Sequence, residues 1–156
     1  MTEPWKDGLL WGLVAFVLVA YLIQGYIVRI SQNITTRYNF DGILRNPWVY
    51  SIVWLILSGF LAWIIYQSWF VSQLYFVLSM ALVFLNILWI VSLYYFGMIE
   101  VAALILMIKL VIVLYLLIDG WNKLERVAWS LLVVYGVWIV IANYFNIRLY
   151  YNNRYA

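Results

Sequence analysis

The sequence predicts an all-α integral membrane protein, a bundle of five transmembrane helices. Of its 156 residues, 69% are hydrophobic and 10% are charged, which is more apolar surface than a soluble domain of this size buries. Five stretches reach the roughly 20 apolar residues that a helix needs to cross a bilayer. These stretches are continuously apolar, whereas strands of a membrane barrel alternate apolar and polar residues, so we expect helices.

The spans are bounded by charges, prolines or glycines. They cover about residues 9–28, 48–66, 70–96, 98–118 and 127–150. Pro47 precedes the second span and suits a helix start, because its missing N–H would lack a partner there anyway. A signal peptide is the competing interpretation of the first span. Two observations argue against a signal peptide. Glu3 and Asp7 reduce the positive charge of the segment before the first span, and no small-residue cleavage site follows the span.

The connections are short, so we expect residues 1–156 to form one domain of antiparallel helical hairpins. The longest loop covers about residues 29–46. The second connection is minimal and is predicted near Gln67 and Ser68, and a turn at Asp119 and Gly120 separates the last two spans.

Basic residues are distributed unevenly between the two ends of the predicted bundle. One end carries Arg29, Arg37, Arg45, Arg148 and Arg154, and the other carries Lys6, Lys123 and Arg126. The positive-inside rule therefore places the 29–46 loop and the C-terminus on the cytoplasmic side. The net charge of +3 is small, and a few arginines flanking the spans are what orientation alone would give, so nucleic-acid binding is not indicated.

The residues that are missing exclude several kinds of chemistry. The chain has no His and no Cys, so zinc sites, iron–sulfur clusters, disulfides and the common axial ligands of haem lack their donors. Its six carboxylates fall at span ends or in loops. We predict no metal site and no resident cofactor, and the residues favour a binding protein over an enzyme.

Aromatic and amide side chains gather on two predicted helix faces. One face holds Tyr75, Ser79, Asn86 and Trp89, and the other holds Tyr135, Trp138, Ala142 and Asn146. Trp54 also lies deep within its span. Buried amides in a membrane need hydrogen bonds, so Asn86 and Asn146 should face protein or a ligand. Helix packing and ligand binding both explain these faces.

Lys109 stands near the middle of the fourth span with no acidic residue at the same depth. A lysine there costs about 2.5–3.5 kcal/mol on insertion scales, so it should face the bundle interior or a wet cavity. We expect its acceptor to be the Asn86 carbonyl, a tyrosine hydroxyl or a ligand carboxylate. Either it ties helices together or it anchors a ligand.

Several motifs resemble the TspO/translocator protein family, also called tryptophan-rich sensory proteins or peripheral benzodiazepine receptors. The run 85–89, Leu-Asn-Ile-Leu-Trp, followed by Tyr-Phe-Gly at 95–97, looks like that family's Leu-Asn-x-x-Trp run ending in Phe-Phe-Gly. Residues 128–146 are similar to its fifth helix. Pro47, Trp48 and Trp54 resemble its Trp-x-Pro-Pro segment and the tryptophan that follows. The resemblance runs in order over about residues 38–150.

The chain also departs from the family pattern. The Pro-Pro pair is absent, and Val134 stands where the family usually has proline. Leu106 replaces an aspartate often found in the fourth helix, and Lys109 follows one turn later.

The resemblance implies a five-helix bundle, often a homodimer, with a cavity near the first loop that binds porphyrins and similar ligands. Matching positions imply pocket residues at Trp54, Asn86, Ala142 and Trp138, motif positions at Trp89 and Tyr135, and an aromatic lid at Phe40. We add Asn146 and Lys109 as ligand-binding candidates. Small residues on the second span, Ser58 and Ala62, are candidates for close helix contact within or between chains.

Three functions follow from this sequence. The first is a membrane receptor or sensor for a tetrapyrrole, with membrane lipid and a second copy of the chain as its other partners. The second is light-dependent porphyrin degradation, with Trp54 and Trp138 as the catalytic candidates. The third is transport or scaffolding in the membrane without chemistry.

Overall fold

The computed structural model describes residues 4–31 and 47–153, and within these residues the chain forms five long helices and no strand. They are α1 (Pro4–Ile30), α3 (Pro47–Val71), α4 (Gln73–Ile90), α5 (Ile99–Asp119) and α6 (Arg126–Asn153). All five elements are long and apolar enough to cross a membrane. The predicted fold class, an all-α membrane bundle of five helices, is confirmed.

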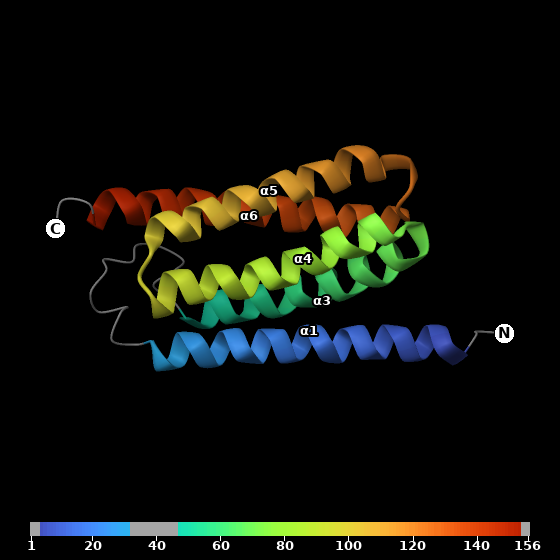
Figure 1. The fold of residues 1–156 in the computed structure, drawn as a ribbon, viewed down its shortest axis with the longest axis horizontal. Coiled ribbons are helices and arrows are strands. Elements are labelled where there is room, and N and C mark those ends of the chain that lie inside the picture. The colour runs from blue at the N-terminus through green and yellow to red at the C-terminus, as the bar shows by residue number, and fades with distance from the viewer. Residues whose placement is uncertain (1–3, 32–46, 154–156) are drawn as a thin grey trace.

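The helices run antiparallel to their neighbours along the chain (Figure 1). Helices α3, α4, α5 and α6 form a closed ring in which each packs against the next and α6 returns to α3. Helix α1 lies outside this ring and packs on α3 and α4. The ring therefore encloses an axis to which α3, α4, α5 and α6 each contribute side chains.

The connection between α3 and α4 differs from the prediction. The sequence pattern places it near Gln67 and Ser68, but both residues are helical, and α3 continues to Val71 before an extended residue, Ser72, interrupts it. The hydroxyl of Ser68 is buried and shares a hydrogen bond of 2.9 Å with Ser79 of α4. A polar residue that suggested a loop is instead satisfied by the neighbouring helix.

The end of α4 widens into a π-helical turn, η2 (Val91–Tyr95), which the sequence did not predict. The backbone N–H of Phe96 donates to the carbonyl of Val91, and Gly97 then turns the chain toward α5 with a φ of 67°. Glycine fits this left-handed conformation because it has no Cβ to clash. At the opposite end of the bundle, a short 3₁₀ turn, η3 (Gly120–Asn122), joins α5 to α6.

Candidate functional site

Six polar and aromatic side chains meet on the axis of the four-helix ring. This axial cluster consists of Trp54 from α3, Asn86 and Trp89 from α4, Lys109 from α5, and Tyr135 and Trp138 from α6. On α4 and on α6 the two members are three residues apart, which places them on the same face of their helix. Trp54 and Lys109 complete the cluster from the two remaining helices.

Lys109 is fully buried, at the midpoint of α5. Its amine donates a hydrogen bond to Oδ1 of Asn86. The Tyr135 hydroxyl approaches the same oxygen at 3.4 Å. The predicted orientation toward the bundle interior is confirmed, and of the three acceptors considered for Lys109 it is the Asn86 oxygen that it contacts.

Two aromatic rings flank the Lys109 amine. Its Nζ lies 5.1 Å from the ring centroid of Trp54 and 5.6 Å from that of Tyr135, within the range of cation–π attraction. In the part of the chain that the structure describes, no carboxylate lies within ion-pair distance of this amine. Among these described residues, the surroundings of Lys109 are therefore aromatic and amide and supply no counter-charge.

The three tryptophans of the cluster form a continuous contact from α4 through α3 to α6. The ring centroids of Trp54 and Trp89 are 5.5 Å apart with the planes tilted by 38°, and those of Trp54 and Trp138 are 6.4 Å apart, edge to face. Trp54 and Trp89 are buried, whereas Trp138 is only half-buried. Trp138 therefore lies at the edge of the cluster. Its indole N–H is nonetheless buried, with no acceptor among the described residues.

The same face of α6 continues away from the cluster to Ala142 and Asn146, both buried. The Asn146 side-chain N–H group donates to the carbonyl of Ile99 at 3.1 Å, which ties α6 to the start of α5. Its Oδ1 is buried and has no donor among the described residues. No contact places Ala142 or Asn146 within the axial cluster itself, and Phe40 lies outside the described residues.

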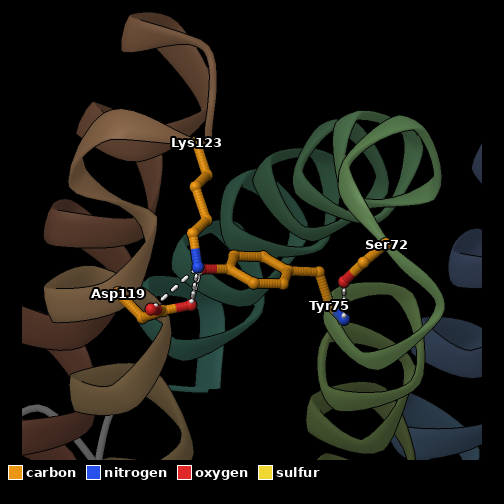
Figure 2. A network of polar contacts seen from close by, with 4 residues as sticks. All are labelled: Ser72, Tyr75, Asp119 and Lys123. Atoms are coloured by element: carbon orange, nitrogen blue, oxygen red, sulfur yellow. Dashed lines mark hydrogen bonds and ion pairs between the residues drawn. The ribbon is translucent and has the colours of Figure 1, made fainter.

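Sequence reasoning identified both polar faces but missed a second polar group near one end of the bundle (Figure 2). The Tyr75 hydroxyl at the start of α4 donates to Asp119 at the end of α5, and Asp119 pairs with Lys123 at 2.8 Å. The Ser72 hydroxyl caps α4 by accepting from the Tyr75 N–H at 3.3 Å. The spacing of Asp119 and Lys123, four residues apart, was the available signal, but nothing in the sequence pointed to Tyr75 as their partner.

This fold and site define a class: a multi-pass membrane protein in which polar and aromatic side chains meet inside a helical bundle. A model of the TspO/MBR family matches residues 12–151, and the chain belongs to this family. The match extends the resemblance seen in the sequence into the first helix. Among curated proteins and solved structures, none matches the chain. Membership in the family supports a membrane sensor or binding role in general terms.

Proposed function

We propose that this protein is a membrane receptor or sensor that binds a porphyrin-type tetrapyrrole, or a similarly flat hydrophobic ligand, at the axial cluster. The observation that carries the proposal is the convergence of three tryptophan rings from three helices beside Lys109 and Asn86. Ligand sites are mostly apolar and aromatic, with a few polar groups that fix orientation. Tryptophan rings stack on flat π-systems and add attraction beyond the area they bury.

Two polar atoms on the α6 face support a ligand position along this helix. The indole N–H of Trp138 and Oδ1 of Asn146 are buried without partners among the described residues. The two residues are eight apart, which on a helix corresponds to roughly 12 Å, and the small residue Ala142 lies between them. Buried polar atoms without partners are costly, so a ligand that hydrogen-bonds to them gains affinity.

The cluster itself is closely packed, so ligand entry requires side chains to move. Trp54 and Trp89 are buried, and the half-buried Trp138 is the ring at the edge, where α6 packs on α3. We therefore place the entry at Trp138. The chain has no His and no Cys, so a bound haem iron would lack its common protein ligands, and a metal-free porphyrin is the preferred ligand.

An absorbance titration with protoporphyrin tests this proposal in the dark. Trp54→Ala and Trp138→Ala should each weaken binding about tenfold, because truncation removes buried ring area and stacking. Trp11→Ala is the matched control, since Trp11 is 69% exposed on α1, which lies outside the four-helix ring. Circular dichroism checks that the variants stay helical. Unchanged affinity in both cluster variants, or no binding by the wild type, would contradict the proposal.

Light-dependent porphyrin degradation is the second candidate function, favoured by the continuous contact among the three tryptophans. Such rings can pass an electron to or from a photo-excited porphyrin, with dioxygen as the oxidant. Trp138→Phe should then retain most binding but lose bleaching under light, since phenylalanine stacks but is much harder to oxidise. Equal bleaching by the two proteins would exclude this role for Trp138, and a protein that neither binds nor bleaches would favour transport or scaffolding.

We also propose that the protein forms a homodimer in the membrane. Ser58 and Ala62, considered for contact within or between chains, are buried within the single chain, so a dimer would use another face of the bundle. Native mass spectrometry from mild detergents and from lipid nanodiscs should show the dimer. A monomer under all of these conditions would rule it out.

A further inference from the structure

We infer that Lys109 and Asn86 together form a docking point for a carboxylate of the tetrapyrrole, at which the Asn86 side-chain oxygen occupies the position of a ligand oxygen until the ligand binds. This inference rests on the proposed porphyrin-binding function and adds to it a preference: a ligand with a free acid group binds more tightly than the same ring system without one.

The first support is the poor match between Lys109 and its present partner. The amine is fully buried at mid-membrane depth, and its hydrogen-bond acceptor is a neutral amide. A carboxylate acceptor would make a charge-assisted bond, which is shorter and roughly twice as strong as a neutral one. Among the described residues no carboxylate supplies this acceptor, and a bound ligand that carries an acid group would supply it.

The second support is that the exchange leaves no polar group without a partner. Asn86 Oδ1 accepts from both Lys109 and the Tyr135 hydroxyl. When a ligand carboxylate takes over the Lys109 amine, Asn86 keeps Tyr135 as its donor. Moving the Lys109 amine from Asn86 to the ligand therefore costs little. A buried acceptor is costly when it has no donor, and the Asn86 oxygen still has the Tyr135 hydroxyl.

The third support is the position of Lys109 relative to the tryptophans. Its amine lies 5.1 Å from the Trp54 ring, and Trp54 contacts Trp138 at the edge of the cluster. A flat ring system that stacks on Trp138 and contacts Trp54 therefore brings an acid side chain at its rim toward the amine. The tryptophans would hold the ring system, and Lys109 would select for the acid.

The experiment compares protoporphyrin with its dimethyl ester, which keeps the ring system and removes both acid groups. Lys109→Met keeps side-chain length and removes the charge. Asn86→Asp keeps side-chain shape and supplies a counter-charge next to Lys109, which competes with the ligand. Lys123→Met is the matched control, because Lys123 is an exposed lysine in the connection between α5 and α6, where it pairs with Asp119 and lies outside the axial cluster.

Both cluster variants should bind protoporphyrin about 10-fold to 100-fold more weakly than the wild type, while the dimethyl ester binds equally to all three proteins. Lys123→Met should match the wild type with both ligands. Equal loss of acid and ester, or no loss of either, overturns the docking point while leaving porphyrin binding intact. If the wild type binds neither ligand, the proposed function itself fails. If Lys109→Met folds poorly, Asn86→Asp still tests the docking point, because it retains Lys109 and is expected to show the same selective loss of protoporphyrin binding.

Discussion

Lys109 occupies the place in α5 where a charged side chain is most costly, about half a membrane from either end of the helix. Its long side chain cannot reach the interface from there, so its partners have to come from other helices. Asn86 from α4 and the rings of Trp54 and Tyr135 supply them. The effect of substituting Lys109 on the stability of the protein therefore depends on which of these partner residues are present.

A double-mutant cycle on Asn86 and Lys109 measures this dependence. Asn86→Leu should lower the free energy of unfolding by about 2–3 kcal/mol, because it leaves the Lys109 amine buried without its acceptor. Lys109→Met should be neutral or stabilising, since it removes the group that needs an acceptor. The double variant should recover most of the loss, as measured by denaturation in detergent micelles followed by circular dichroism. Strictly additive losses would show that the two residues are not coupled.

The packing of α5 against α6 depends on a residue without a side chain. A Cβ at Gly136 of α6 would lie 3.0 Å from Cγ1 of Val113, a fully buried residue of α5, and 3.7 Å from Leu117. Val113 is β-branched and has little freedom to rotate away. The two helices can approach this closely because position 136 is glycine.

Gly136→Ala should therefore destabilise the protein by about 1–3 kcal/mol, since overpacking forces side chains or backbone to shift. Gly59→Ala is the control, because a Cβ at Gly59 of α3 meets no atom within 4 Å. The control should leave the unfolding temperature unchanged or slightly raised, as alanine favours helix. Equal effects of the two substitutions would contradict the close approach at Gly136.

Helices α4 and α5 are tied at one end of the bundle by the contact of Tyr75 with Asp119 (Figure 2). Tyr75→Phe keeps the buried ring and removes only the hydroxyl, so it should cost about 1–2 kcal/mol of unfolding free energy. The same change at Tyr95, whose ring is 55% exposed, should have no measurable effect. The unfolding temperatures of the two variants and the wild type are compared in one detergent. An unchanged unfolding temperature for Tyr75→Phe would show that the hydroxyl contributes nothing to the stability of the bundle.

For the whole molecule, the antiparallel helices place the end of α6 and the turn between α5 and α6 at opposite ends of the bundle (Figure 1). The excess of arginine near the 29–46 loop and the C-terminus predicts that this end faces the cytoplasm. Which side each end faces is a property of the protein in its membrane, and it is open to direct measurement.

The natural absence of cysteine makes this measurement simple. Single variants Tyr151→Cys and Glu125→Cys place one thiol at each end, both at exposed positions, without changing the number of basic residues. In spheroplasts of a bacterial host, a membrane-impermeant maleimide should label Glu125→Cys at once and Tyr151→Cys only after lysis. The reverse pattern would invert the predicted orientation.

Local sequence patterns were sufficient to predict the fold class and the polar faces of two helices. Hydrophobic runs of membrane length require helices, and residues three or four apart share a face, so helical spacing alone groups Asn86 with Trp89 and Tyr135 with Trp138. All eight residues of the two predicted faces are buried or half-buried. Helical periodicity depends only on residues close together in the chain, and for this reason it can be recognised from the amino-acid order.

The packing of the helices was needed to show that Trp54 and Lys109 join these faces on one axis, that α3 continues through Ser68, and that Tyr75 reaches Asp119. Each of these depends on which helix lies beside which and how each is rotated about its own axis. In lipid, a leucine facing the acyl chains is as stable as one facing another helix, so hydrophobicity carries little information about rotation. Close packing and interhelical hydrogen bonds set it instead, and these form between residues far apart in the chain.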